Sequence, residues 1–464
     1  MYYQALATDY DGTLATDGAV FEPTLQALEA LRRSGRRLLM VTGRELDDLK
    51  SVFAHLELFD LVVAENGALL YRPKTGEEIL LAEPTPVLFR QRLEALGVRP
   101  LSFGRIIVAT VEPHETEVLA TIRELGLELQ IIFNKGAVMV LPPGVNKATG
   151  LRAACKELGL SPHNVVGMGD AENDFAFLEL CGCAVAVANA LPMLKQAADV
   201  TTEGARGEGV AELAHRMIKS DLADLVALTR QQTVIGRRPD GGELLLRPRE
   251  NLLLAGSSGA GKAQIADEIV SALGRRRFQT CIIDPEGDHA RRKDALVLET
   301  DGQKLPDLPK TLPLSDGILV LNLAGMAPAE RGAAMREALL ALVALRDRLG
   351  RPHWILIEKA HLALPAELAP QAALHEVGGL FLVSVHPERI APWMLEGIDL
   401  ALAVGEAPAK TLADFAAAAG HSLPGTAAVS ALPAGRALMW QRGTVPAIER
   451  IELPDQARRR PDAA

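Results

Sequence analysis

The sequence predicts an α/β protein in which a doubly wound parallel sheet carries an inserted α/β cap and is followed by a second α/β domain with a parallel sheet. Short apolar runs, such as residues 38–41 and 165–169, end abruptly in polar residues. Strands of an open α/β sheet end in this way at the edge where ligands bind. Helical periodicity follows such runs, for example from residue 147 onward. A turn-rich stretch at 236–242 separates two such series, and a length of 464 residues suits two or three domains.

The first apolar run ends in Asp9 and Asp11, two carboxylates one residue apart. Residues i and i+2 of a strand point to the same side, and Gly12 begins a turn, so we expect both acids at the carboxyl end of the first strand. One carboxylate there can attack phosphorus while the other handles the proton of the leaving oxygen. Asp and Gly also mark ordinary turns, so the pair alone leaves that alternative open.

The next strand end and a later helix start add groups that suit phosphate. Thr42, Gly43 and Arg44 follow the run at 38–41, and a hydroxyl with backbone N–H groups can hold a phosphate oxygen. Lys147 starts a helical pattern, and its ammonium could neutralise a phosphorylated intermediate. Two readings of Arg44 stay open, contact with substrate and pairing with an acidic neighbour.

A second acidic cluster follows the run at 165–169. It contains Asp170, Asn173 and Asp174. Hard oxygen ligands of this kind suit Mg²⁺, which prefers one or two carboxylates together with phosphate and water. The sequence therefore predicts a phosphate-handling magnesium site at the end of the first sheet.

On these motifs, residues 1–220 resemble the haloacid dehalogenase superfamily of phosphohydrolases, in its Cof-like branch with a type IIB cap. Glu65, Asn66 and Gly67 form a further motif typical of that branch. The resemblance implies that Asp9 is the nucleophile that becomes an aspartyl-phosphate, and that Asp11 is the general acid and then the base that activates water.

The same resemblance implies the roles of the remaining residues. Thr42 and Lys147 would hold the phosphoryl group. Substrate contacts would come from Thr42, Gly43, Arg44 and Asn173. The implied Mg²⁺ site draws on Asp9, the backbone carbonyl of Asp11, Asp170 and Asp174, with Asp174 as the brace.

An insert at about 70–145 is predicted to form the cap. Helical patterns at 87–96 and 115–125 alternate with strand-like runs at 106–111, 128–133 and 137–141. Such a cap would close over the site and select the substrate. The resemblance implies a small phosphorylated metabolite, such as a sugar phosphate or phosphoglycolate.

The second domain is expected at 246–452, after a linker helix and turn at 221–245. An apolar run at 251–255 leads into a glycine-rich loop followed by a helical pattern. Such a loop can wrap backbone N–H groups around phosphates, while its lysine reaches further phosphate oxygens. The predicted nucleotide-binding residues are Gly256, Ser257, Ser258, Gly259, Ala260, Gly261, Lys262 and Ala263.

Residues 234–445 resemble the P-loop ATPases of the HerA-like, DNA-translocating group, with two departures. Ala263 stands where Ser or Thr normally offers a hydroxyl to Mg²⁺. After the run at 354–357, Glu358 stands in place of the metal-linked Asp and Lys359 in place of the catalytic Glu. We therefore expect a domain that binds ATP or another nucleotide, or a vestigial one, with little or no ATPase activity.

Composition limits the remaining classes of function. A hydrophobic share of 48%, a charged share of 23% and a formal net charge of −10 indicate a globular protein without a broad nucleic-acid surface. The four cysteines lack zinc spacing and suit a reducing compartment, and no apolar stretch is long enough to span a bilayer. We expect a cytoplasmic protein, no membrane partner, a homo-oligomer as one candidate assembly, and a disordered tail at 453–464.

Two functions of different class follow. The first is a Mg²⁺-dependent phosphatase that a carboxyl-terminal domain regulates, localises or assembles. The second is a nucleotide-responsive assembly protein, acting near DNA, with the phosphatase as an accessory domain. The intact first set of residues and the altered second set favour the phosphatase.

Overall fold

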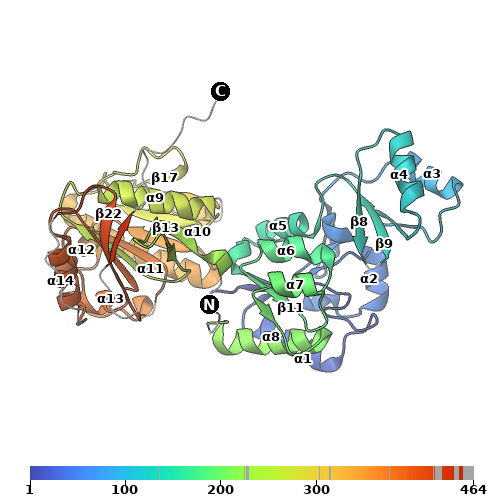
Figure 1. The fold of residues 1–464 in the computed structure, drawn as a ribbon, viewed down its shortest axis with the longest axis horizontal. Coiled ribbons are helices and arrows are strands. Elements are labelled where there is room, and N and C mark those ends of the chain that lie inside the picture. Colours follow the sequence, from blue (N-terminus) through green and yellow to red (C-terminus); the bar gives the residue numbers. More distant parts are fainter. Residues whose placement is uncertain are drawn as a thin grey trace. The chain divides into compact units, whose positions relative to one another are not determined.

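The computed structural model describes residues 1–134, 136–223, 225, 229–301, 304–312, 315–375, 377–421, 423, 431–443 and 449–452 (Figure 1). The chain divides into two compact units, 1–230 and 231–464. Both units contain α/β sheets, which confirms the expected class. The predicted tail at 453–464 lies outside the described residues.

The first unit is built on a sheet with the strand order β12-β11-β10-β1-β2-β3-β4-β5. Its strands are β1 (Ala5–Thr8), β2 (Arg37–Val41), β3 (Leu61–Ala64), β4 (Leu69–Arg72), β5 (Glu77–Leu80), β10 (Val165–Gly169), β11 (Cys183–Ala186) and β12 (Val200–Thr201). The strands from β12 to β3 are parallel, whereas β4 and β5 are antiparallel additions at the edge. Every residue of β1 and β3 is buried, as expected for strands covered on both faces.

Helices connect these strands. They are α1 (Glu22–Arg33), α2 (Leu46–Val52), α5 (Lys147–Glu157), α6 (Phe175–Leu180), α7 (Pro192–Ala197) and α8 (Arg206–Ser220). Helix α5 starts with a capping box in which Asn146 and Thr149 satisfy each other's backbone N–H groups. This capping box fixes the position of Lys147, the first residue of the helix.

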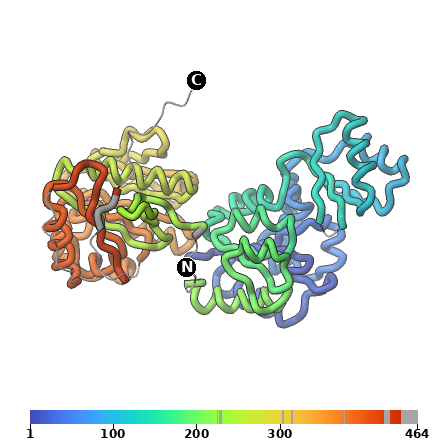
Figure 2. The backbone as a smooth tube through the Cα atoms, viewed as in Figure 1, coloured from blue at the N-terminus to red at the C-terminus, as the bar shows by residue number. Residues whose placement is uncertain are grey.

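The cap is a separate small layer of sheet and helices within the first unit. Its elements are β6 (Ser102–Phe103), β7 (Val108–Val111), β8 (Gln130–Asn134), β9 (Ala137–Leu141), α3 (Val87–Ala95) and α4 (Glu115–Glu124). Phe89, Val108 and Val118 belong to a hydrophobic cluster of its own. Figure 2 shows the cap as an excursion of the chain, in cyan tones, between the blue and green parts of the core.

The cap is shorter than the sequence predicted, because residues 69–80 belong to the core. Strand β4 pairs with β3, and β5 pairs with β4, so both extend the main sheet. Leu69 and Leu70 are buried in the main hydrophobic cluster. The expected boundary near residue 70 was therefore wrong, and the cap begins after Leu80.

The second unit contains a longer sheet, with the order β14-β13-β23-β22-β21-β15-β20-β19-β16-β18-β17. Its strands are β13 (Thr233–Arg237), β14 (Glu243–Leu246), β15 (Leu252–Gly256), β16 (Thr280–Asp284), β17 (Ala295–Glu299), β18 (Ile318–Asn322), β19 (Trp354–Ile357), β20 (Leu380–Ser384), β21 (Leu400–Val404), β22 (Arg436–Gln441) and β23 (Glu449–Glu452). The strands from β21 to β17 are parallel, and those from β22 to β14 are antiparallel.

Helices cover both faces of this sheet. They are α9 (Lys262–Arg275), α10 (Leu308–Thr311), α11 (Pro328–Leu349), α12 (Ala360–Ala363), α13 (Pro392–Leu395) and α14 (Pro408–Ala418). Leu252 and Leu254 of β15 pack in the same cluster as helix α9, whereas Leu253 packs in the cluster that contains α11 and α14. Alternate side chains of one strand therefore serve opposite layers, as the period of two requires.

The predicted linker at 221–245 was also partly wrong. Helix α8 ends at Ser220, and residues 224 and 226–228 lie outside the described part of the chain. Strands β13 and β14 occupy much of the rest, and their inward residues Ile235, Leu244 and Leu246 are buried. Among the described residues, no helix is long and apolar enough to cross a membrane.

Two glycines allow helix α5 to approach the short turn at Glu65–Gly67. A Cβ atom at Gly150 would lie 2.4 Å from Val63 Cγ1 and 2.6 Å from the Cα of Gly67. Gly67 has φ +103°, and a Cβ atom there would lie 1.9 Å from the carbonyl oxygen of Asn146. The start of α5, and with it Lys147, depends on this close contact.

We expect Gly150→Ala to lower the free energy of unfolding by about 1–3 kcal/mol through overpacking. Within a helix, the same exchange normally stabilises by roughly 0.5–1 kcal/mol. Gly274→Ala in α9 is the matched control, because its nearest neighbour, Ile318 Cδ1, would lie 3.7 Å away. Urea unfolding of the full chain measures both variants, and an unchanged midpoint for Gly150→Ala would contradict the packing argument.

Candidate active site

Three neighbouring strands bring the predicted residues of the first unit together. Strand β1 lies between β10 and β2, and Thr8 at its end is level with Met168 and Met40. Asp9, Thr42 and Asp170 directly follow these three strands. All three side chains therefore meet at the carboxyl edge of the sheet, as the sequence predicted.

Lys147 connects the two acidic clusters. Its Nζ donates hydrogen bonds of 2.6 Å to Asp9 Oδ1 and 2.6 Å to Asp174 Oδ1. The other oxygen of Asp174 accepts backbone N–H groups of Asp170, at 2.8 Å, and Ala171, at 2.9 Å. Asp174 thus binds the lysine and the loop after β10 at once, which is the geometry of a brace.

Burial controls the protonation of this group. It raises the pKa of the Asp9 carboxyl, the charge of Asp174 adds to the rise, and Lys147 opposes it. Burial alone would lower the pKa of Lys147, but the carboxylates of Asp174 and Asp9 outweigh it and raise that pKa. The lysine is therefore a cation beside Asp9.

The donor set fits a magnesium ion. Asp9, Asp170 and Asp174 each offer an oxygen, and these oxygens lie within 4.8 Å of one another. Three buried carboxylates around one ammonium leave negative charge that a divalent cation would compensate. Carboxylate oxygens are the ligands that Mg²⁺ prefers, and Thr13 Oγ1 orients Asp170 through a hydrogen bond of 3.0 Å.

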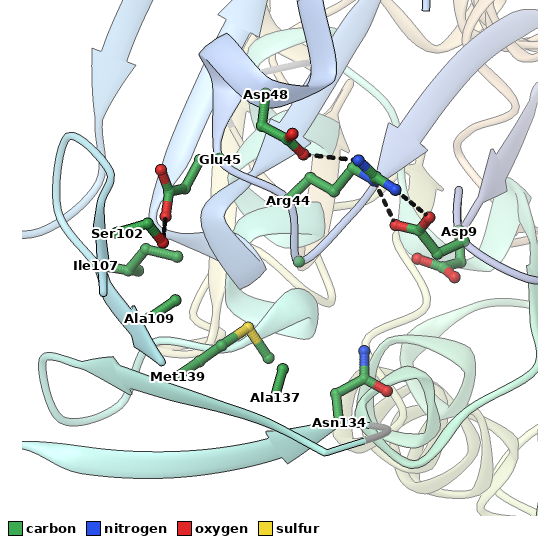
Figure 3. A pocket seen from close by; sticks show the side chains of 12 residues that line it. Asp9, Arg44, Glu45, Asp48, Ser102, Ile107, Ala109, Asn134, Ala137 and Met139 are labelled. Carbon is green, nitrogen blue, oxygen red and sulfur yellow. Dashed lines mark hydrogen bonds and ion pairs between the residues drawn. The ribbon is translucent and has the colours of Figure 1, made fainter. Parts of the chain in front are cut away.

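Asp11 is paired with Arg44. The Nε and Nη2 atoms of Arg44 each donate to one Asp11 oxygen at 2.7 Å, and its Nη1 donates to Asp48 at 2.7 Å. Figure 3 shows the guanidinium joined to Asp48 on one side and to a carboxylate on the other. The structure thus shows Arg44 paired with acidic neighbours, and its contact with substrate stays a prediction.

The other predicted substrate contacts lie around the same site. Thr42 is buried, and its hydroxyl accepts the backbone N–H of Arg44 at 3.1 Å. Asn173 donates to Asn66 Oδ1 at 3.3 Å, and a Cβ atom on Gly43 would lie 3.7 Å from the Asn173 amide nitrogen. Asn66, with φ +54°, is in the left-handed region, so the turn after β3 aims its side chain toward this site.

A cavity of about 330 Å³ opens in front of Asp9, within the range of small-molecule sites (Figure 3). Core and cap both line it. The lining residues are Asp9, Asp11, Gly43, Arg44, Glu45, Asp48, Ser102, Ile107, Ala109, Asn134, Ala137 and Met139. No local sequence pattern pointed to Glu45, Asp48 or the cap residues, because nothing in such a pattern reveals which cap side chains face the core.

Glu65 fastens the cap to the core. Its buried carboxylate accepts the backbone N–H groups of Arg105, Ile106 and Ile107, at 2.7, 2.8 and 3.2 Å. A Cβ atom on Gly104 would lie 2.5 Å from the same carboxyl carbon. The turn at Glu65–Gly67 was expected as a motif of the Cof-like branch, but its sequence did not indicate this role for the Glu65 side chain.

In the second unit, the glycine-rich loop connects β15 to α9 as predicted. Gly259 and Gly261 have φ +78° and +80°. Lys262 Nζ donates to the carbonyl oxygens of Gly256, at 2.9 Å, and Ser257, at 2.7 Å. The lysine therefore closes the loop on itself.

The strand end at Glu358 belongs to a buried network of charges. Glu358 contacts His289 Nε2 at 3.1 Å, and His289 Nδ1 contacts Asp267 at 2.9 Å. Burial alone would lower the pKa of His289, but hydrogen bonds to Asp267 and Glu358 raise it to about 10. Lys359 forms an ion pair with Glu286. Because residue 359 is a lysine, this position offers no carboxylate that could polarise a water molecule.

Known proteins are similar in sequence to the first unit. The family of haloacid dehalogenase-like hydrolases matches residues 6–91 and 104–213. A phosphoglycolate phosphatase of Methanothermobacter thermautotrophicus is 30% identical over 220 residues, which are 46% of this chain and 99% of that protein. A phosphoglycolate phosphatase of Haloarcula marismortui is 32% identical over 217 residues, covering 45% of this chain and 94% of that protein.

A solved structure is also similar. A haloacid dehalogenase-like hydrolase from Bacteroides thetaiotaomicron has a TM-score of 0.41 and 19% identity, and the match covers 46% of this chain and 99% of that one. On the sequence relatives, the chain belongs to the haloacid dehalogenase-like hydrolases through its first unit. This confirms the resemblance of residues 1–220 to that superfamily and the enzyme class, a phosphoric monoester hydrolase. The resemblance of residues 234–445 to P-loop ATPases stays a prediction.

We expect Lys147→Met to lower the free energy of unfolding by about 3–5 kcal/mol in the absence of divalent ions. The reason is that Asp9 and Asp174 would face each other, buried, without the ammonium. Lys50→Met is the control, since Lys50 is 36% exposed and lies 3.5 Å from Glu78. Such a surface pair contributes about 0–1 kcal/mol. Equal urea midpoints for the two variants would contradict the role given to Lys147.

Proposed function

We propose that the first unit is a Mg²⁺-dependent phosphatase that releases phosphate from a small phosphorylated metabolite. The observation that carries the proposal is the buried Asp9–Lys147–Asp174 group, of which Asp9 lines a cavity shared by core and cap. Phosphoryl transfer needs positioning and charge neutralisation above all, and this group supplies both.

The positions of the side chains support the following reaction. An Asp9 oxygen attacks phosphorus, the bond to the leaving oxygen breaks, and Asp11 gives that oxygen a proton. Asp11 then takes a proton from water, whose oxygen attacks phosphorus and releases Asp9. Lys147 and Thr42 hold the phosphoryl oxygens, with Gly43, Arg44 and Asn173 as substrate contacts. A Mg²⁺ ion on Asp9, Asp170, Asp174 and the Asp11 carbonyl would supply electrostatic stabilisation.

The size of the cavity supports a small substrate. A volume of about 330 Å³ lies at the lower end of the range for ligand sites. Two relatives are phosphoglycolate phosphatases, so phosphoglycolate and small sugar phosphates are the substrates to test first. A cytoplasmic location is part of the same proposal, because buried cysteines suit a reducing compartment.

We expect Asp9→Asn to lower phosphate release from p-nitrophenyl phosphate and from 2-phosphoglycolate by at least about 1,000-fold, because an amide cannot form the acyl phosphate. In the absence of Mg²⁺, the melting temperature of Asp9→Asn should equal or exceed that of the wild type. Asp17→Asn is the control, because Asp17 has φ +51°, which Asn also tolerates. Full activity of Asp9→Asn would refute the assignment of the nucleophile.

For the second unit we propose nucleotide binding without rapid hydrolysis, in a regulatory or assembly role. The loop at 256–263 has left-handed glycines and a lysine at the start of α9, which suits phosphate. Ala263 lacks a hydroxyl, and Lys359 is paired with Glu286. The other candidate is a DNA-associated assembly protein with an accessory phosphatase. No feature of the described residues in either unit favours it.

Titration calorimetry with ATP and Mg²⁺ tests this second proposal. The Asp9→Asn background removes phosphatase turnover from the experiment. We expect a heat of binding that Lys262→Ala abolishes and that Lys310→Ala preserves, since Lys310 is 85% exposed and paired only with Asp307 among the described residues. No heat would refute binding, and rapid ATP turnover dependent on Lys262 would refute the expected lack of hydrolysis.

A further inference from the structure

We infer that the second unit binds its nucleoside triphosphate without a divalent ion. The carboxylate that would face such an ion, Glu358, is already bound by the side chain of His289, and position 263 offers no hydroxyl. This inference rests on the nucleotide binding proposed above and names the form of the ligand, the metal-free triphosphate anion.

A nucleotide site built on a glycine-rich loop normally holds Mg²⁺ through two protein groups. One is a Ser or Thr hydroxyl directly after the lysine of the loop, and the other is a carboxylate at the end of a neighbouring strand. The residue directly after Lys262 is Ala263, whose methyl group cannot bind an ion. The carboxylate position, after the end of β19, is filled by Glu358. Of this pair, Glu358 alone could therefore serve Mg²⁺.

Glu358 lies near the glycine-rich loop. Strand β20 pairs in parallel with β15 and with β19, so the loop after β15 and the residue after β19 lie at the same edge of the sheet. Burial lowers the pKa of Lys262, and the charge of Glu358 opposes this shift, as expected for side chains close to each other. Glu358 thus stands beside the lysine that would hold the phosphates.

The Glu358 carboxylate is already bound by a cation. His289 Nε2 lies 3.1 Å from Glu358 Oε1, and His289 Nδ1 lies 2.9 Å from Asp267 Oδ1. Ionised carboxylates only accept hydrogen bonds, so both ring nitrogens donate and the ring is an imidazolium. A divalent ion at Glu358 would have to displace this buried cation or lie beside it against charge repulsion.

The position of His289 is fixed by the turn that carries it. Asp284, the last residue of β16, accepts the backbone N–H groups of Gly287 and His289, both at 2.8 Å. The ring itself is held at Nδ1 by Asp267, which also forms an ion pair with Arg292. His289 therefore binds Glu358 as a fixed part of the fold, because its backbone and its ring are both held.

The balance of charge differs from that of the first unit. There, three buried carboxylates surround one ammonium and leave negative charge for a metal ion. In the second unit, Asp267 and Glu358 face two cations, His289 and Arg292. Arg292 also pairs with Asp294, which lies at the surface. The two carboxylates near the proposed nucleotide site are thus compensated by side chains and need no divalent ion.

A lysine near the loop can compensate the charge of the triphosphate in place of the ion. Lys359 follows Glu358 directly, and its ion pair with Glu286 joins side chains that are 34% and 45% exposed. Such a solvent-exposed pair is weak, so a phosphate anion can compete for the ammonium group. Lys359 and Lys262 would then supply two positive charges to the metal-free nucleotide.

Titration calorimetry with ATP in two buffers tests the inference on the full chain carrying Asp9→Asn. One buffer contains EDTA, and the other contains Mg²⁺ in excess over ATP. We expect the dissociation constant in EDTA to equal or lie below that in Mg²⁺. A site that uses the metal would bind ATP at least about tenfold more weakly in EDTA, and that result would overturn the inference.

The same titration separates the inference from the proposed function. Heat that Lys262→Ala abolishes belongs to the glycine-rich loop. Binding that requires Mg²⁺ would leave nucleotide binding standing and remove only the inference. No heat in either buffer would refute nucleotide binding itself, and the inference with it.

Two substitutions test the part played by His289. Ala263→Ser supplies the hydroxyl but leaves Glu358 bound to the histidine, so Mg²⁺ should still not tighten ATP binding. Ala263→Ser combined with His289→Gln also frees Glu358 from the cation, and Mg²⁺ should then tighten binding at least about tenfold. A preference for Mg²⁺ in Ala263→Ser alone would overturn the inference, as would a folded double variant without that preference.

Ala263→Ser combined with His353→Gln is the matched control. His353 is another buried histidine, but it precedes β19 and accepts the backbone N–H of Gln279 at 2.9 Å, at the amino edge of the sheet. This variant should gain nothing from Mg²⁺, and a gain equal to that of the His289 variant would overturn the inference. Circular dichroism checks folding. If His289→Gln prevents folding, the comparison of EDTA with Mg²⁺ for the natural loop and for Ala263→Ser still decides.

Discussion

The first unit depends on one buried ammonium. Lys147 is 1% exposed and lies 2.6 Å from carboxylates of Asp9 and Asp174, which follow two different strands. A buried charge is tolerated only when it is paired, so the ends of β1 and β10 and the start of α5 must come together for each to be stable. Helix α5 can start against the turn after β3 because Gly67 and Gly150 leave room for the contact and the capping box at Asn146 fixes the first turn of the helix.

The second carboxylate of the site has a different environment. Asp9 is buried with the lysine, whereas Asp11 is partly exposed and bound to Arg44. Two acids one residue apart thus acquire separate properties, because one faces the interior and the other faces the cavity. In the proposed reaction, this separation suits Asp9 to the role of nucleophile and Asp11 to the exchange of protons with the leaving group and with water.

Local sequence patterns predicted the elements that the chain builds from neighbouring residues. The strand ends at Asp9, Thr42 and Asp170 and the cap helices were expected, because apolar runs and helical periods are local. The edge strands β4, β5, β13 and β14 were assigned to a cap or a linker, since only their partners in the sheet show where they belong. The pairing of Arg44 with Asp11 was one of two open readings, because the choice depends on tertiary distance. Asn134 and Glu65 were missed for the same reason.

The cap packs around its own hydrophobic cluster, and the carboxylate of Glu65 in the core accepts hydrogen bonds from three consecutive backbone amides of the cap. Backbone amides are present whatever the side chains are. These three hydrogen bonds do not depend on which side chains stand at 105–107. The side chains themselves make further contacts, since Arg105 pairs with Asp47 and Glu78, and Ile106 and Ile107 pack in one cluster with Ala68. A sequence change at 105–107 would therefore keep the backbone contacts to Glu65 and alter the side-chain contacts between cap and core.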